Sequence, residues 1–222
     1  MDLIYCAGGN PLLVDIARSE GWQLGMRSDA SPMRYPPIFV DVEYKAPNFE
    51  RHLEIVKRYR PRYATVPDLS ESEVSEQDIT RAIEQAGQLA PYCEIILIVP
   101  KLSGQIALLP QDMAIGYSVP SGYGGAQYPI WELVGRRIHL LGGSPRKQFQ
   151  AFLHLSAIAT VGSVDGNYAH KMAIKYAMYW QKQKWLYHPR KDTKAKDLYA
   201  ECWRWSCRNL MTAWGRLTQT SF

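Results

Sequence analysis

A short apolar segment, a loop and then a helical pattern recur in this order along the chain, and this order limits the possible folds more than any other feature. The loops carry Gly, Pro or Asp, which interrupt regular structure. The predicted strands are residues 3–7, 38–40, 63–66, 94–99, 113–115 and 138–141, and a seventh that starts at Thr160 and carries Asp165. Strands that alternate with helices in this way indicate a parallel sheet.

Proline positions help to delimit the helices between these strands. Pro11 suits the first turn of a helix with apolar residues on one face, whereas Pro61 and Pro91 end two others. The predicted helices cover residues 11–20, 48–60 and 76–90, a short stretch near 129–134, a segment opened by Ser144 as cap and Pro145, and a segment from about Tyr168. Residues 25–37 are rich in Ser, Pro and Arg and are predicted to form a loop.

A closed barrel fits this pattern better than an open dinucleotide-binding sheet. No Gly-x-Gly-x-x-Gly motif opens a strand–helix unit, so a dinucleotide site loses its main support. The 222 residues are enough for one domain with one sizeable core. We therefore expect an α/β fold, a compact or irregular (β/α)8 TIM-like barrel, over residues 1–222. This fold needs eight strands, so the eighth is either missing or hidden in the C-terminal segment.

The composition is that of a globular protein, with 46% hydrophobic and 21% charged residues. No apolar run approaches the ~20 residues that a membrane span needs. The N-terminus lacks the basic and apolar regions of a signal peptide. The four cysteines are too scattered for a disulfide framework. We therefore expect a cytoplasmic protein in a reducing compartment, with no membrane partner.

Positive charge is concentrated near the C-terminus. From Gly166 to Phe222 there are eleven Lys or Arg and three acidic residues, a net charge of +8, whereas the preceding 165 residues carry −3. Five of the seven tryptophans also lie there. Basic and aromatic side chains together suit a surface that neutralises phosphates and stacks on unpaired bases. We expect residues 168–222 to form a basic, Trp-containing helical extension packed on the barrel; alternatively, the segment is a solvated helix whose tryptophans pack inward.

Acidic residues follow three of the predicted strands: Asp41 with Glu43, Asp68, and Asp165. The other strand ends carry Asn10, Lys101, Gly116 with Tyr117, and Gly142 with Gly143. In a barrel, the carboxyl ends of the strands meet at the face that holds the active site. Carboxylates held close together acquire different pKa values, which separates a nucleophile from a general acid/base. Two alternatives stay open, because Asp165 by itself is a typical helix cap and grouped acids also suit Mg²⁺.

Four short motifs occur in order between about Ile38 and His170. They are Val66-Pro67-Asp68, Ala114-Ile-Gly-Tyr-Ser-Val119, Arg137-Ile-His-Leu-Leu-Gly-Gly-Ser-Pro145 and Ser163-Val-Asp165. Their order and spacing resemble the tRNA-guanine transglycosylase superfamily, and within it the phage-type DNA-guanine transglycosylases. The resemblance implies that guanine in DNA is exchanged for a 7-deazaguanine base such as preQ0, in the host cytoplasm if the protein is phage-encoded.

The resemblance also implies roles for individual residues. Asp165 falls at the nucleophile that holds the sugar covalently, Asp41 at the general acid/base, and Asp68 at the acid that hydrogen-bonds the base. The implied base pocket also includes Lys101, Gly116, Tyr117, Gly142, Gly143 and Ser163. Tyr117 or Tyr123 is a candidate to stack on the base, and the alternative is that the side chain only packs within the fold. Nucleic-acid contacts are implied for Asn167, His170, Lys171 and Lys175, with solvated helix residues as the alternative.

The chain departs from the family pattern in three places. Asp41 is followed by Val-Glu-Tyr-Lys instead of the family's Ser-Gly-Gly-Phe-Gln, which leaves Glu43 as a rival general acid/base. The family's glutamine in the loop after the fourth strand is replaced here by Pro100-Lys101. Cys202 and Cys207 do not form the zinc motif of the tRNA enzymes, so we expect no metal and no cofactor. The missing zinc motif favours DNA over RNA as the polymer.

Other classes of function stay open. One is a transglycosylase that acts on RNA, and another is a barrel isomerase or aldolase in which Lys101 forms a Schiff base. A third is a non-catalytic nucleic-acid-binding protein whose acids only cap helices.

Overall fold

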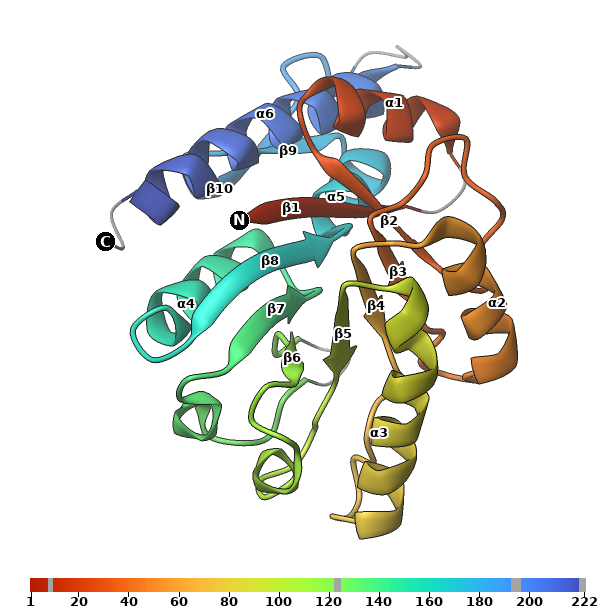
Figure 1. The fold of residues 1–222 in the computed structure, drawn as a ribbon. Coiled ribbons are helices and arrows are strands. Elements are labelled where there is room, and N and C mark those ends of the chain that lie inside the picture. The colour runs from red at the N-terminus through yellow and green to blue at the C-terminus, as the bar shows by residue number, and fades with distance from the viewer. Residues whose placement is uncertain (8–9, 122–124, 193–196, 220–222) are drawn as a thin grey trace.

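The computed structural model describes residues 1–7, 10–121, 125–192 and 197–219 and contains a closed barrel of eight parallel strands (Figure 1). The strands follow one another around the barrel in chain order, and β8 pairs with β1 to close it. They are β1 (Asp2–Ala7), β2 (Gln23–Arg27), β3 (Phe39–Asp41), β4 (Tyr63–Thr65), β5 (Ile95–Ile98), β6 (Ala114–Ser118), β7 (Arg137–Leu141) and β8 (Thr160–Gly166). The predicted α/β class and TIM-like barrel are confirmed.

The eighth strand is β2, between β1 and β3. The prediction of a loop at residues 25–37 was wrong at its start, because Gln23–Arg27 pairs in parallel with both neighbouring strands. A Cβ at Gly25 would lie 2.9 Å from Ile4 Cγ2 and 2.9 Å from Phe39 Cδ1. The barrel wall is therefore too tight for a side chain at this position, and a glycine inside a strand weakens the sequence signal for that strand.

Helices cover the outside of the barrel (Figure 1). They are α1 (Pro11–Ser19), α2 (Phe49–Tyr59), α3 (Glu76–Leu89) with η1 (Ala90–Tyr92), α4 (Pro145–Leu155) and α5 (Tyr168–Tyr176). Side chains of Asn10, Asn48 and Ser75 cap the first three. Ser144 is the N-cap residue of α4 and Pro145 occupies its first turn, as predicted, but the Ser144 side chain makes no capping hydrogen bond. Among the described residues after β5 and β6, the 3₁₀ turns η2 (Ile106–Leu108) and η3 (Ile130–Leu133) stand in place of α-helices, which makes the barrel compact.

The prediction that the C-terminal segment is purely helical was wrong. After α5 it forms an antiparallel hairpin of β9 (Met178–Gln181) and β10 (Lys184–Tyr187), followed by the long helix α6 (Leu198–Gln219). The Trp203 indole donates to Leu13 O at 2.9 Å, and the Trp22 indole donates to Cys207 O at 3.1 Å. These bonds join α6 to α1 and its loop, so α6 belongs to the helical layer of the barrel. Within the described ranges, no helix has the length and apolar character that a membrane crossing requires.

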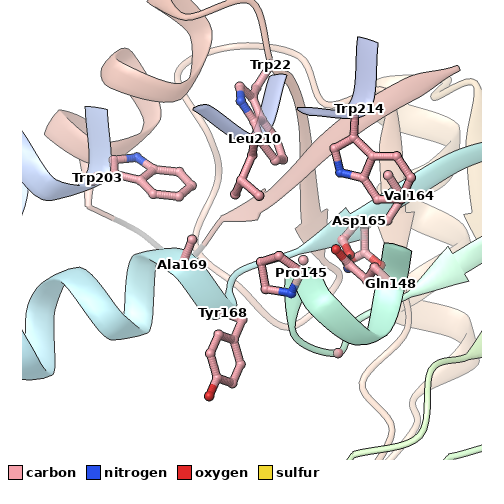
Figure 2. Close-up of a pocket in the computed structure, with 12 residues that line it drawn as sticks. Trp22, Pro145, Gln148, Val164, Asp165, Tyr168, Ala169, Trp203, Leu210 and Trp214 are labelled. Atoms are coloured by element: carbon pink, nitrogen blue, oxygen red, sulfur yellow. Dashed lines mark hydrogen bonds between the residues drawn. The ribbon is translucent and has the colours of Figure 1, made fainter. Parts of the chain in front are cut away.

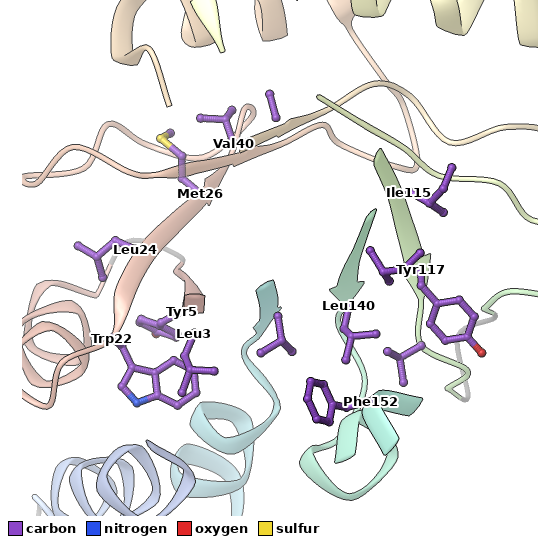
Figure 3. Packing of buried hydrophobic residues seen from close by; sticks show 14 of the residues in the cluster. Leu3, Tyr5, Trp22, Leu24, Met26, Val40, Ile115, Tyr117, Leu140 and Phe152 are labelled. Carbon is purple, nitrogen blue, oxygen red and sulfur yellow. The ribbon is translucent and has the colours of Figure 1, made fainter. Parts of the chain in front are cut away.

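Hydrophobic cores lie on both faces of the barrel wall. The outer core packs beneath the helices, and Figure 3 shows part of it, including Leu3, Met26, Val40 and Phe152. The inner core is formed by Ile4, Cys6, Phe39, Tyr63, Leu97 and Ala114. Because successive strand residues alternate between the two faces, a residue two positions after an inner-core residue also points inward.

Candidate active site

Two acidic side chains point into the barrel at the carboxyl ends of their strands. Asp41 stands two positions after the inner-core residue Phe39 in β3, and Asp165 follows the outer-core residue Val164 in β8. Alternation therefore directs both carboxyl groups inward, at the face where barrels carry their chemistry. The two groups interact, because the charge of Asp165 acts on the protonation of Asp41.

The Asp41 carboxyl group is held by a threonine of the next strand. The Thr65 hydroxyl donates to Asp41 Oδ1 at 2.9 Å and accepts from the Val42 backbone N–H at 2.8 Å. Burial, followed by the nearby charges of Asp165 and Asp68, raises the pKa of Asp41 to about 8, against the opposing effects of Thr65 and Arg27. Asp41 is therefore mainly protonated at neutral pH and is able to donate a proton.

Asp165 is fixed from two directions. Its Oδ1 accepts from the Gly142 backbone N–H at 3.0 Å and lies 3.4 Å from His139 Nε2. Gly142 has φ +62°, a conformation that glycine adopts without steric cost and that turns its N–H toward β8. The Gln148 side chain donates to Gly142 O and to Asp165 O, both at 2.7 Å. The ends of β7 and β8 are thus connected by hydrogen bonds, one of which is accepted by the Asp165 carboxylate.

An ion pair lies after β4 and β5, at the carboxyl-terminal end of the barrel, which we call the barrel mouth. Lys101, whose side chain is only 6% exposed, places Nζ 2.6 Å from Asp68 Oδ2 and 3.6 Å from Glu71 Oε1. The same ammonium lies 3.5 Å from the Ser118 hydroxyl at the end of β6. Burial raises the pKa of Asp68, and the charge of Lys101 opposes that rise. Asp68 keeps 29% of its side chain exposed, so it remains accessible to a ligand.

Glu43, the rival general acid/base, is engaged elsewhere. Its Oε2 lies 3.0 Å from Arg27 Nη2, and its Oε1 accepts from the Lys45 backbone N–H at 2.9 Å. Arg27 also pairs with Asp29. Glu43 is therefore held by Arg27 and the Lys45 backbone, whereas Asp41 is the acid on which the charge of Asp165 acts.

The predicted pocket residues of β6 and β7 divide between the two faces of the wall. Gly116 points inward, and a Cβ there would meet Leu141 Cδ1 at 2.7 Å. Gly143 packs against Val119. Tyr117 lies in the outer core, and the centroid of its ring is 6.1 Å from that of Tyr128. This position fits the packing alternative and not a place in the base pocket beside the acids. Tyr123, the other predicted stacking residue, lies outside the described residues.

The predicted nucleic-acid contacts on α5 also divide. Lys171 and Lys175 are exposed one turn apart, and Asn167 precedes the helix. His170 instead contacts the Tyr5 hydroxyl through Nδ1 at 3.0 Å and packs against Trp203. Burial and the charge of Lys171 lower the pKa of His170, which favours a neutral ring. His170 is therefore part of the packing, and the prediction of a phosphate contact does not fit its position.

His139 is the site residue that the sequence did not reveal. It points into the barrel from β7, it is 1% exposed, and it contacts both Asp165 and the predicted pocket residue Ser163. Its position between outward Ile138 and Leu140 in the strand pattern was the signal that placed it inside. Among the described residues, no three His, Cys, Asp or Glu side chains are arranged to hold a metal ion.

A small cavity backs the site on the outer side of β8. It has a volume of about 20 Å³ and lies between the end of β8, α4 and the tryptophans Trp22, Trp203 and Trp214 (Figure 2). Asp165 and Gln148 contribute to its lining. This space is large enough for about one water molecule and far too small for a purine. A base would therefore have to approach Asp165 from the barrel mouth.

Comparison with protein-family models gives a match for this chain. No curated protein matches the chain. A family model described as "Family of unknown function (DUF6610)" matches residues 17–215, from α1 to α6. Because the match covers most of the sequence, the chain belongs to this family.

Proposed function

We propose that this protein exchanges guanine in DNA for a 7-deazaguanine base, such as preQ0, through a covalent aspartyl–sugar intermediate. The observation that carries the proposal is the pair formed by Asp41 and Asp165. These two inward carboxyl groups interact, and Asp41, with a pKa of about 8, keeps its proton at neutral pH. A base-exchanging enzyme needs this combination of a proton donor and a nucleophilic carboxylate.

The proposed reaction has two balanced halves. The Asp165 carboxylate forms a bond to the anomeric carbon while the glycosidic bond breaks, and the bonding electrons leave with guanine. Asp41 gives its proton to the departing base and becomes a carboxylate. The incoming 7-deazaguanine then returns a ring N–H proton to Asp41 and attacks the anomeric carbon, which releases Asp165. Neither half requires an oxidant, a metal or a cofactor.

Asp68 is the proposed acceptor for the edge of the base. Guanine and 7-deazaguanines present N–H donors there, and a carboxylate accepts two of them. The 2.6 Å ion pair with Lys101 holds Asp68 in place and favours its ionised form. Gly116 lies on the inner wall of β6, where the side chains of Leu141 and Val99 fill the space next to it.

The exposed face of α5 is the proposed contact for the phosphate backbone. Tyr168, Lys171 and Lys175 are spaced three and four residues apart, so they share one side of this helix. All three are exposed, and the Tyr168 ring contacts Trp185 of the hairpin at 5.7 Å. A guanine must leave the duplex to reach Asp165, which costs a few kcal/mol, and backbone contacts compensate part of that cost.

The proposal is tested with labelled guanine or preQ0 and guanine-containing DNA. The wild-type protein should incorporate label, and Asp165→Asn should incorporate none while binding DNA with unchanged affinity, because the amide keeps the shape but not the nucleophile. Asp112→Asn, which changes an exposed carboxylate just before β6, at the amino-terminal end of the strands, is the matched control and should retain exchange. Incorporation by Asp165→Asn at the wild-type rate would exclude Asp165 as the nucleophile.

The backbone contact predicts a salt effect. Replacing both Lys171 and Lys175 by Ala should weaken DNA binding and reduce the slope of log K against log salt by about 2, because each lost phosphate contact removes about one unit. Arg58→Ala on α2, an exposed cation on another helix, is the control and should leave the slope unchanged. An unchanged slope in the double variant would place the DNA elsewhere. Parallel titrations with RNA test the RNA-acting alternative.

One observation supports a second candidate, a Schiff-base enzyme. Lys101 is buried at a strand end, where barrel enzymes carry reactive lysines. Its ammonium would have to lose a proton and leave the ion pair with Asp68 before it attacked a carbonyl group. Borohydride trapping of a carbonyl compound on Lys101, together with no base exchange, would favour this candidate.

A further inference from the structure

Ser163, His139 and Asp165 form a chain of polar groups inside the barrel. The Ser163 hydroxyl lies 2.7 Å from His139 Nδ1, and His139 Nε2 lies 3.4 Å from Asp165 Oδ1. Ser163 and His139 are each 1% exposed, so water does not compete for these contacts. The imidazole is further enclosed by the rings of Phe39 and Tyr63, at centroid distances of 4.9 and 6.0 Å.

The chemistry of the three groups determines where the protons lie. An ionised Asp165 only accepts hydrogen bonds, so His139 must present its N–H at Nε2. Nδ1 of the neutral ring is then an acceptor, and the Ser163 hydroxyl donates to it. The nearby Tyr63 hydroxyl gives its proton to Asp2 Oδ2 at 2.7 Å, so it has none for Ser163, although its oxygen still interacts with the Ser163 side chain. Ser163 thus selects the tautomer of His139 that Asp165 requires.

We propose that His139, oriented by Ser163, is a positioning residue for Asp165. The inference deepens the proposed base exchange and rests on it. Asp165 Oδ1 is held by two groups, the Gly142 N–H and His139 Nε2, on different sides. Both contacts involve the same oxygen, which leaves Oδ2 to form the bond to the anomeric carbon.

These residue types also make up the triad of serine hydrolases, but their arrangement here differs. In a hydrolase the serine is the group that meets the substrate and the aspartate is buried behind the histidine. Here Ser163 stands two positions before Asp165 in β8 and is the more deeply buried of the two. Asp165 is closer to the mouth, so the order of access is reversed and the acid is the group that reacts.

Two substitutions of His139 separate positioning from packing. The amide nitrogen of Gln reaches the place of Nε2, whereas the shorter Asn side chain reaches only the place of Nδ1. His139→Gln should therefore keep the Asp165 contact and exchange within about threefold of wild type. His139→Asn should lower the single-turnover exchange rate by about 10–100-fold, the usual loss for such a supporting contact, with unchanged DNA affinity. Ser163→Ala should give an intermediate loss.

Thermal melts of all variants establish that they are folded before rates are compared. Equal rates in wild type and His139→Asn would overturn the inference, as would equal losses in the Gln and Asn variants, because a packing role does not distinguish them. A wild-type protein without exchange would instead end the proposed function. Nitrogen-15 NMR provides a readout independent of activity: the Nε2–H tautomer of His139 is expected, and the Nδ1–H tautomer would overturn the inference.

Discussion

At the scale of single residues, the structure assigns different chemistry to carboxyl groups that look alike in the sequence. Glu43 pairs with Arg27 and Asp68 pairs with Lys101, so each has a cation beside it. Asp41 accepts a hydrogen bond from the neutral Thr65 hydroxyl and faces the charge of Asp165, which outweighs the opposing charge of Arg27. An acid in this position retains its proton to higher pH, which is why Asp41 is the proton donor in the proposed exchange.

The raised pKa of Asp41 predicts a pH-dependent stability. Between the ordinary value of 3.8 and the folded value of about 8, the folded protein keeps a proton that the unfolded chain loses. The free energy of unfolding therefore falls as pH rises through this window. Asp41→Asn, which does not titrate, should remove this contribution and be more stable than wild type at pH 9, by on the order of a few kcal/mol. Urea unfolding at pH 5, 7 and 9 measures the difference; a difference that does not change with pH would contradict the raised pKa.

The same pair predicts the pH dependence of exchange. Protonated Asp41 is needed when guanine leaves, so the rate of guanine release should decline above a pH of about 8. Rapid-quench measurement of released guanine across pH 6–10 checks this. Asp41→Asn should abolish the decline along with most of the activity, and a wild-type rate that rises steadily to pH 10 would exclude Asp41 as the acid.

At the scale of elements, β2 shows how a barrel strand can escape recognition. Its outward residues Leu24 and Met26 belong to the outer core, but the inward Gly25 has no side chain. The strand is held by pairing with β1 and β3 on either side. Its stability therefore comes from neighbours that are distant in sequence and not from its own composition.

The tight wall at Gly25 predicts a costly substitution. Gly25→Ala should lower the free energy of unfolding by about 1–3 kcal/mol, because the added Cβ would lie 2.9 Å from both Ile4 and Phe39. Gly87→Ala in α3 is the matched control: nothing lies within 4 Å of its Cβ position, so it should stabilise the helix by up to about 1 kcal/mol. Denaturant unfolding compares the two; a neutral Gly25→Ala would show that the wall relaxes.

At the scale of the whole molecule, the C-terminal segment has a structural role as well as a charged one. Trp203 and Trp214 are buried, and the Trp214 ring lies 4.6 Å from that of Phe149 on α4. α6 therefore joins α1 to α4 across the strands that close the barrel. Part of the positive charge is also neutralised, because Arg204 and Arg208 pair with Glu20. Lys171 and Lys175 on α5 remain the better candidates for the DNA contact.

The packing of α6 on the barrel predicts that replacing two different tryptophans by Ala lowers the free energy of unfolding by different amounts. Trp214→Ala should destabilise the protein by about 3–5 kcal/mol through the cavity it leaves. Trp131→Ala removes a side chain from a residue that is 66% exposed and should change stability by less than about 0.5 kcal/mol. Thermal and urea unfolding measure both; equal small effects would mean that α6 packs weakly on the barrel.

The repeated strand–helix order and the acids at the strand ends were evident from the sequence. Both follow from local rules, because periodicity and the residues that end a strand depend on near neighbours in the chain. These rules predicted seven of the eight strands, the barrel and the candidates Asp41 and Asp165. They failed at β2 and at the hairpin β9–β10, where tertiary packing determines the element.

Only the tertiary structure decided which candidates meet. It directed Tyr117 and His170 into packing contacts, engaged Glu43 with Arg27, and brought His139 from the middle of β7 to Asp165. Such pairings depend on the folded barrel, which places β7 beside β8, and β8 beside β1 although these two strands are far apart in sequence. The sequence by itself thus determined the fold class and the supply of carboxyl groups, and barrel closure determined their partners and protonation, because burial and neighbouring charge exist only in the folded protein.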